Sequence, residues 1–231
     1  MSSLSPLSTL FARVVDINNL VGNTAQPNRE TALHQLKGII RPEMEELQIG
    51  IDMRDRHETR DGLADVLFTL AGLYGRMGLA IPEHWDLNDL SGLRNTNDCL
   101  RKLFDCQTAL EIIAEQQFAG ISAAMSAIAG NSVELVIKIA QLEDIDYLSD
   151  LDAVIASNMT KFDRDEESAQ ATHDKYGTIN VVVLQKKRSV SEQEPPYIVT
   201  FSAQDQRGND GKNYPKGKWL KSVHFQDTDF R

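Results

Sequence analysis

Apolar side chains recur with helical spacing along most of the first 160 residues, and this periodicity predicts a mainly helical fold. Residues three and four apart share one face of a helix, so each apolar series predicts a helix with one buried side. Pro42 falls inside the second predicted helix and is expected to kink or interrupt it, because proline lacks a backbone N–H. The predicted helices span residues 6–20, 31–52, 58–77, 98–115, 132–142 and 150–162.

The pattern changes after residue 177 to short β-rich runs, which are TINVVVL, YIVTFSA and WLKSVHF. We therefore expect a mainly α protein, with a helical bundle over residues 1–177 and a small antiparallel β extension over residues 178–231. Within the bundle, residues 86–146 are predicted to form an inserted helical hairpin. Its small-residue run FAGISAAMSAIAG would let two helices approach closely.

Charge is divided unevenly along the 231 residues, whose formal net charge is −10. Residues 1–174 carry 14 basic and 28 acidic side chains, whereas residues 175–231 carry 10 and 6. An acidic body would repel a phosphate backbone, so we expect no nucleic-acid partner. The lysines of the basic part protect the edge of a β-ribbon in one interpretation. In the other, they close over substrate phosphates or pack on a neighbouring subunit.

Cysteine usage and hydropathy predict a soluble cytoplasmic protein. Cys99 and Cys106 lie two helical turns apart, where a disulfide is geometrically implausible, so we expect buried thiols in a reducing compartment. The N-terminal residues lack the basic start and apolar core of a secretory signal. The longest charge-free stretch, residues 116–133, is too polar for a membrane span, so no membrane partner is expected.

Two acidic pairs stand at helical spacing in successive predicted helices. Glu43 and Glu46 form the first pair and Asp61 and Asp65 the second, each beside apolar residues, whereas Glu45 points elsewhere. Like charges close to a core are costly unless a cation neutralises them, and carboxylates suit Mg²⁺ or Mn²⁺. Spacing alone leaves open a second interpretation, in which these are solvated helix faces without a shared ligand.

The ordered series PEMEEL, RDGLADVLFTLAGLYGRMGL and ASNMTKFD resembles the MazG-like all-α nucleoside triphosphate pyrophosphohydrolases. It is most similar to the phage-type and phosphoribosyl-ATP-pyrophosphohydrolase-like branch, over roughly residues 10–80 and 147–177. The chain departs from that pattern in two places. Pro42 stands where the first glutamate of the family's E-E-x-x-E series belongs, which leaves Glu43 and Glu46, and Gly62 stands where the glutamate of E-x-x-D belongs, with Asp61 one residue earlier.

The resemblance implies metal-dependent hydrolysis between the α and β phosphates of a nucleotide, giving a monophosphate and pyrophosphate. It implies that Glu43, Glu46, Asp61 and Asp65 hold Mg²⁺, for which Mn²⁺ can substitute, and that Glu43 or Glu46 serves as general base. Members differ in the base they accept, and some phage members act on dGTP. The resemblance also implies a homo-oligomer, either a dimer or a tetramer, with residues 86–146 as an insertion at the oligomer contact.

The SNMTKF segment would supply a cation and an amide. Lys161 is expected to contact phosphate, and Asn158, three residues earlier on the same face, to bind base, sugar or phosphate. Ser157 is a weaker candidate, because it can equally cap a helix. Asn18 is a further candidate for substrate binding, although its neighbour sequence VGN also suits a helix end.

The remaining motifs are weaker indications of function. Tyr74 and Trp85 could stack on a base, but lone aromatic residues more often pack in a core. The acidic run LEDIDYLSDLD is interpreted as a solvated helix start, and the histidines show no metal-ligand spacing. The alternative from another functional class is a non-catalytic nucleotide-binding or helical interaction protein derived from this fold, which the Pro42 departure favours.

Overall fold

The computed structural model describes residues 4–87, 90–116, 123–189 and 195–230. The chain folds into two compact units. Unit 1 comprises residues 1–18, 23–154 and 230–231, and unit 2 comprises residues 19–22 and 155–229. The predicted division at residues 177 and 178 therefore differs from the structure, which groups the end of one helix and a further helix with the strands.

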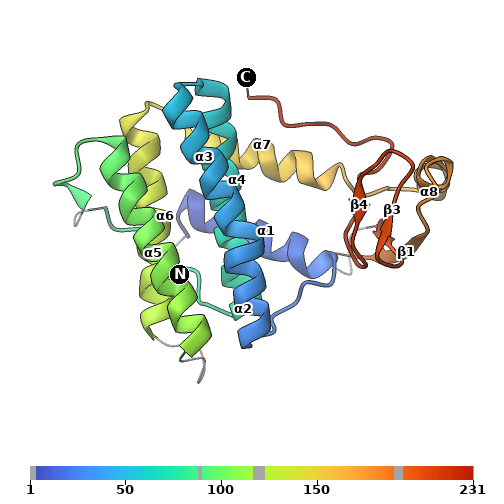
Figure 1. Ribbon diagram of the computed structural model, residues 1–231, viewed down its shortest axis with the longest axis horizontal. Helices are drawn as coiled ribbons and strands as arrows, with labels where there is room; N and C mark the ends of the chain where they lie inside the picture. Colours follow the sequence, from blue (N-terminus) through green and yellow to red (C-terminus); the bar gives the residue numbers. More distant parts are fainter. Residues whose placement is uncertain (1–3, 88–89, 117–122, 190–194, 231) are drawn as a thin grey trace. The chain divides into compact units, whose positions relative to one another are not determined.

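Unit 1 is built from helices (Figure 1). They confirm the mainly α prediction, although some bounds differ from those expected. The last of them continues into unit 2. In chain order they are α1 (Pro6–Leu20), α2 (Arg29–Gln35), π-helix η1 (Leu36–Ile40), α3 (Arg41–Met53), α4 (Arg56–Met77), α5 (Thr96–Gln116), α6 (Ala123–Leu142) and α7 (Tyr147–Met159).

The helix α4 forms the centre of this core because nearly all of its faces are apolar or small. Leu63, Leu67, Leu70 and Leu73 are each exposed by 1% or less. Helix α3 packs along α4, and α5 packs along α6 as the expected helical hairpin, both of which can be followed in Figure 1. The α6 helix begins at Ala123, so most of the small-residue run is helical, while residues 117–122 lie outside the described part.

Helix α6 is long and apolar enough to cross a membrane by length and composition, with a mean hydropathy of 1.3 over its most apolar window. Half of that window is buried against the rest of the protein. A core helix passes the same composition test, and the packing of α6 on α5 and α4 accounts for its apolar residues.

Pro42 disturbs the expected long helix without breaking it, and the structure shows how. The backbone N–H of Arg41 donates to the carbonyl of Leu36, five residues earlier, so the turn before the proline is a π-helix. The backbone stays helical through Ile40 and Arg41 into α3, so the π-turn accommodates Pro42 within a continuous helix. The Leu36 carbonyl also accepts from Nε2 of Gln107 at 2.7 Å, so the bulge is held from α5.

Unit 2 contains α8 (Glu166–Thr178) and the strands β1 (Val183–Arg188), β2 (Tyr197–Ser202), β3 (Gln206–Arg207) and β4 (Asn213–Tyr214). Strands β1 and β2 pair antiparallel, from Val183 opposite Ser202 to Arg188 opposite Tyr197, and β3 pairs with β4. Helix α8 packs on β1 and β2. The small antiparallel β extension is thus confirmed, but it shares its unit with a helix.

Two predictions in this region were wrong in detail. The run WLKSVHF is not a strand and makes only an isolated bridge from Trp219 to Phe201. Helix α8 was not predicted, because its buried face carries small and polar residues where an apolar series was sought. Those buried residues are Ser168, Ala169, Thr172 and Tyr176.

Candidate functional site

The two acidic pairs lie on α3 and α4, which form a tight antiparallel hairpin. Arg54 and Asp55 connect the helices, and the Asp55 carboxylate caps α4 by accepting from the backbone of His57 at 2.9 Å. Glycine brings the helices unusually close. A Cβ atom placed on Gly62 would lie 2.7 Å from Cα of Leu47, and one on Gly50 would lie 2.9 Å from the backbone of Thr59.

These two close contacts define the register of the hairpin. Leu47 lies opposite Gly62. One helical turn back along α3 and one turn forward along α4 therefore place Glu43 within one residue of the level of Asp65. Glu46 falls between the levels of Asp61 and Asp65. The close contact also explains why this chain cannot place a glutamate at position 62, because any side chain there would collide with the α3 backbone.

The exposure of the four carboxylates differs. Glu43, Asp61 and Asp65 are partly buried, whereas Glu46 and Glu45 are exposed. Within the described residues, no three His, Cys, Asp or Glu side chains lie close enough together to hold a metal ion without other ligands. The donor chemistry nevertheless suits Mg²⁺, which binds through one or two carboxylates, keeps several waters and takes its other ligands from substrate phosphates.

A buried ion pair next to Asp61 was missed by the sequence analysis. Arg60 donates from Nε to Oδ2 of Asp150 at 3.0 Å and from Nη2 to Oδ1 at 2.7 Å. Asp150 is only 1% exposed, so the interpretation of LEDIDYLSDLD as a wholly solvated run was wrong at this residue. The hydrogen bond to Asp150 raises the pKa of Arg60. Arg60 also donates to the Phe230 carbonyl at 3.0 Å and stacks on the Phe230 ring.

Replacing Asp150 by alanine is expected to destabilise unit 1 by about 3 kcal/mol, because it leaves the Arg60 guanidinium without its charged partner. Urea unfolding followed by circular dichroism measures this. Asp152→Ala is the matched control, since its pair with Arg13 is exposed on both sides and should change stability by less than about 1 kcal/mol. Equal effects from both variants would contradict the assignment of a structural role to the buried pair.

Of three further sequence candidates in unit 1, Asn18 and Tyr74 are buried and Trp85 is partly buried. Asn18 is 9% exposed, and its Nδ2 donates to the Val14 carbonyl at 3.0 Å, within its own helix. Tyr74 and Trp85 pack with Phe11 at ring distances of 5.3 to 6.0 Å, which confirms the core interpretation of the two aromatics. Burial raises the pKa of Tyr74.

Asn158 and Lys161 lie in unit 2, at the end of α7 and just beyond it. The Lys161 ammonium donates to Oδ1 of Asn158 at 2.5 Å, so the structure brings these two predicted binding residues together. Asn158 is 8% exposed and Lys161 is partly buried. Ser157 donates from Oγ to the Gln226 carbonyl at 2.7 Å and thereby attaches the C-terminal segment, defined as residues 218–227, to the SNMTKFD motif.

Asp163, which ends the SNMTKFD motif, is a second buried acid that the sequence analysis missed. It is 2% exposed, and its Oδ1 accepts from the hydroxyls of Thr172 at 3.0 Å and Ser222 at 2.5 Å. Its Oδ2 has no hydrogen-bond partner among the described residues. The carboxylate therefore joins α8 and the C-terminal segment to the motif.

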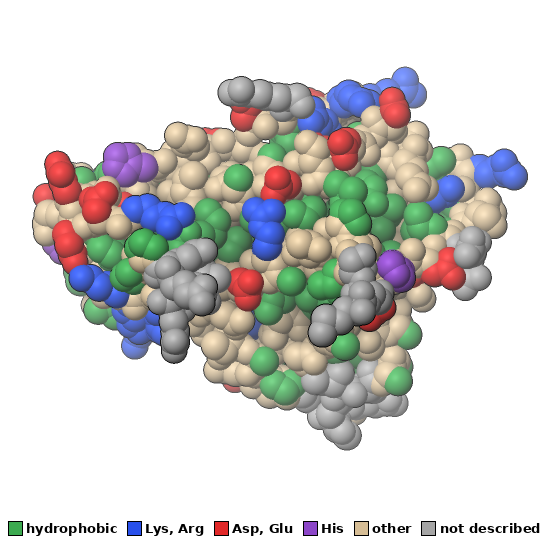
Figure 2. Space-filling view, turned by 180° about the vertical axis from the view of Figure 1, so that it is seen from behind, with side chains coloured by type: hydrophobic (Ala, Val, Ile, Leu, Met, Phe, Trp, Pro, Cys, Tyr) green, Lys and Arg blue, Asp and Glu red, His purple; other side chains and the backbone are tan. Residues whose placement is uncertain are grey.

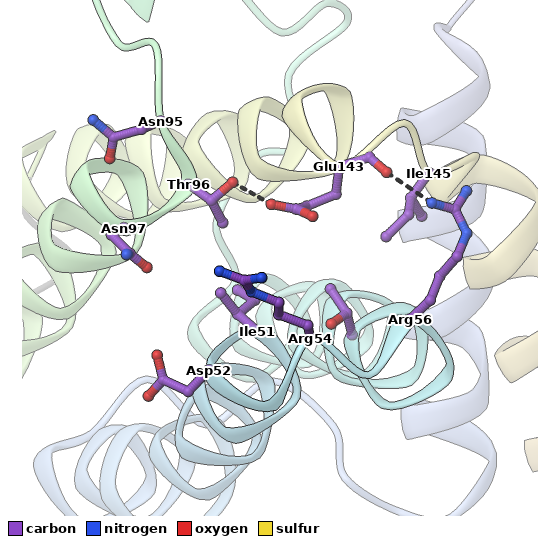
Figure 3. A pocket seen from close by; sticks show the side chains of 10 residues that line it. Ile51, Asp52, Arg54, Arg56, Asn95, Thr96, Asn97, Glu143 and Ile145 are labelled. Carbon is purple, nitrogen blue, oxygen red and sulfur yellow. Dashed lines mark hydrogen bonds between the residues drawn. The ribbon is translucent and has the colours of Figure 1, made fainter.

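A cavity of about 490 Å³ opens at the α3–α4 turn, beside the start of α5 (Figure 3). Arg54 adopts a left-handed conformation with φ of 54° and extends into it, while Arg56 donates to the carbonyls of Glu143 and Asp144. The Thr96 hydroxyl donates to the Glu143 carboxylate. The cavity has two acidic and two basic residues in its lining, and no predicted site residue is among the described residues that line it.

Charged side chains of both signs are visible on the face drawn in Figure 2, with apolar atoms between them. The candidate carboxylates are distinguished from the rest by the hairpin that carries them.

Two aspartates in unit 2 make its stability dependent on acid pH. Hydrogen bonds from Ser168 lower the pKa of Asp165, the N-cap of α8, and the Tyr214 hydroxyl, which donates to Asp210 at 2.7 Å, lowers the pKa of Asp210. Both pKa values are lowered from 3.8. Each group thus binds protons less readily in the folded state, so its stabilisation is complete above pH 3.8 and is lost as the pH falls through the lower folded value.

We expect unit 2 to lose urea resistance as the pH falls from about pH 4 through the lowered folded pKa values of the two aspartates, measured by fluorescence of Trp219. Asp165→Asn and Asp210→Asn should each flatten this dependence. Asp174→Asn, at an exposed position on α8, is the control and should leave the slope unchanged. A slope that persists undiminished in the double variant would contradict the assignment.

Comparison with known proteins assigns this chain to no family. No protein-family model matches the chain, and neither the curated proteins nor the solved structures contain a match to it. The functional conclusion therefore depends on the residues and their geometry.

Proposed function

We propose that the chain is a metal-dependent (d)NTP pyrophosphohydrolase. The observation that carries the proposal is the close contact between Leu47 and Gly62, which aligns the two acidic pairs along one hairpin. Glu43 lies within one residue of the level of Asp65 on the neighbouring helix, which supports a cation shared between the two carboxylates. The order of the three motifs along the chain, with its resemblance to MazG-like enzymes, supplies the reaction class.

In the proposed reaction a water oxygen attacks the α phosphorus, and the bond from that phosphorus to the α–β bridging oxygen breaks. The products are a nucleoside monophosphate and pyrophosphate. Bound Mg²⁺ or Mn²⁺ would polarise the phosphoryl oxygens and stabilise the developing charge. Glu43, Glu46, Asp61 and Asp65 would hold the metal, and either Glu43 or Glu46 would take the proton from the attacking water.

Substrate contacts are assigned to residues outside the hairpin. Lys161 would bind phosphate oxygens as a point charge, and Asn158, which already accepts a hydrogen bond from Lys161, would orient it or contact the sugar or base. Asn18 remains a third candidate for substrate binding. Because its side chain is buried, the substrate would have to reach the C-terminal end of α1. A homo-oligomer is part of the proposal, with the α5–α6 hairpin as its contact.

A panel of ribo- and deoxyribonucleoside triphosphates with Mg²⁺ or Mn²⁺ and a pyrophosphate detector tests the proposal. We expect release of pyrophosphate and the monophosphate from at least one nucleotide, with no release when EDTA is present. Failure with every nucleotide and both metals would overturn the enzymatic function.

A non-catalytic nucleotide-binding protein is the second candidate. It is favoured by the lack of a group of three metal-ligating side chains among the described residues and by Pro42 at the first glutamate position. Thermal shifts with non-hydrolysable nucleotide analogues separate the two functions. Stabilisation without any turnover of the natural nucleotides would support this second candidate.

A further inference from the structure

A cavity of about 380 Å³ lies within unit 2, beside the end of the SNMTKFD motif. Its lining comes from the motif, from the start of α8 and from the C-terminal segment, all of which belong to this one compact unit. Asp163 is part of the lining although it is only 2% exposed. We call this space the Asp163 cavity.

One oxygen of the buried Asp163 carboxylate makes no hydrogen bond within the described part of the chain. The backbone N–H and carbonyl of Asp163 both pair with Ile198, at 3.0 and 2.8 Å. Its Oδ1 accepts from the hydroxyls of Thr172 and Ser222, which leaves Oδ2 without a partner. By elimination, Oδ2 is the polar atom that Asp163 can offer to the cavity.

This free oxygen favours a hydrogen-bond donor that enters from the cavity. Buried polar side-chain atoms nearly always have a partner, either from the protein or from a bound water or ion. Burial and the charge of Lys221 lower the pKa of Lys175, whereas Asp163 raises it, so Lys175 lies close enough to interact with the carboxylate. The Lys175 ammonium, however, donates to the carbonyls of Lys221 and Ser222.

The charges around the Asp163 cavity favour a donor that is also a cation. The described residues of the lining include two acids, Asp163 and Asp165, and one arginine, Arg164. The Arg164 guanidinium lies 3.7 Å from the centre of the Tyr197 ring, so an aromatic face already holds it. With His224 neutral, two carboxylates and one guanidinium leave the lining with one negative charge in excess.

A primary ammonium group suits this lining better than a metal ion does. Among the described residues, no three His, Cys, Asp or Glu side chains are grouped closely enough to hold a metal. An ammonium group donates up to three hydrogen bonds, and its bond to a carboxylate is charge-assisted. Thr160 and Gln226 add neutral polar groups to the lining, and Met159 and Phe162 add apolar surface for an attached carbon chain.

We propose that the Asp163 cavity binds the primary ammonium group of a small organic amine, which donates a hydrogen bond to Oδ2 of Asp163. The site is independent of the proposed pyrophosphohydrolase reaction, because it lies in unit 2 and uses none of the residues assigned to metal or nucleotide. A bound amine contacts the motif, the start of α8 and the C-terminal segment together, so binding stabilises unit 2.

An NMR titration of the ¹⁵N-labelled full chain with n-butylammonium chloride, at constant ionic strength, tests the proposal. We expect saturable shifts of residues that line the cavity. The n-butyltrimethylammonium ion keeps the charge and the carbon chain but has no N–H donor, and it should not reproduce these shifts.

Asp163→Asn is expected to weaken n-butylammonium binding at least tenfold, the effect of losing a hydrogen bond to a charged group. Asp174→Asn, at an exposed position of α8 outside the lining, is the matched control and should bind as wild type does. Circular dichroism verifies that each variant is folded. If Asp163→Asn is not, Gln226→Trp takes its place, because a larger side chain at this exposed position of the lining should fill the cavity.

Three results would each overturn the proposal. They are the absence of saturable binding by the folded wild type, equal binding of the two ammonium ions, and an unchanged affinity in the folded cavity variant. Loss of binding in that variant, with wild-type affinity in Asp174→Asn, would support it. Since the titration contains no nucleotide, its outcome is separate from the test of pyrophosphohydrolase activity.

Discussion

Replacing Gly62 by alanine is expected to destabilise unit 1 by about 3 kcal/mol, toward the upper end for overpacking in a core. The added Cβ would lie 2.7 Å from Cα of Leu47, where the neighbouring atom is backbone and cannot rotate away. Alanine favours a helix by about 1 kcal/mol over glycine, so the measured value is a net cost. Chemical denaturation followed by circular dichroism gives the change in the free energy of unfolding.

Gly130→Ala is the control for this prediction. Gly130 lies within α6, and a Cβ there would make only an ordinary contact of 3.8 Å with the Tyr74 hydroxyl. This variant should therefore be neutral or more stable by up to about 1 kcal/mol. If Gly62→Ala changed the free energy of unfolding no more than Gly130→Ala, the close approach of α3 and α4 would be contradicted. The register that aligns the acidic pairs would then be contradicted as well.

Asp65→Asn and Glu46→Gln are expected to lower pyrophosphohydrolase turnover by about 100-fold or more. Changes to groups that only orient metal ligands already cost about 10- to 100-fold, so removing the charge of a ligand itself should cost at least as much. The amides are nearly isosteric with the acids, and neither position lies at the Leu47–Gly62 contact. Steady-state kinetics across a range of Mg²⁺ concentrations measures the loss.

Glu45→Gln is the matched control, because Glu45 is adjacent to Glu46 and exposed but lies on another face of α3. It should retain wild-type turnover. Stability gives a second readout, since Mg²⁺ should raise the melting temperature of the wild type and of Glu45→Gln more than that of Asp65→Asn. Full activity in Asp65→Asn and Glu46→Gln would exclude these carboxylates as the metal site.

The helices of unit 1 could be predicted because their buried faces repeat apolar residues every three or four positions. Helix α8 could not, since Thr172 and Ser168 fill its buried side and their burial depends on strands far along the chain. The run at Trp219 looked like a strand because its residues favour β structure. In the protein it packs instead on Phe162 and the motif, a tertiary contact that local propensity does not encode.

The candidate site shows the same division between local and distant information. The spacing of Glu43, Glu46, Asp61 and Asp65 could be read directly, but their relative level depends on the contact of Gly62 with the α3 backbone. The burial of Asp150 and Asp163 depends on partners 90 and 59 residues away, namely Arg60 and Ser222. A charge-rich local sequence gives no sign of such partners.

The π-helix before α3 has a consequence for comparing this chain with others. A π-turn holds one residue more than the regular helix around it, and one residue corresponds to about 100° of rotation. A relative without the bulge would be one residue shorter between positions 36 and 40, and its carboxylates would be offset by one position in any ungapped alignment. We therefore expect a one-residue gap at Gly38 to bring the Glu43 and Glu46 series of this chain into register with such relatives.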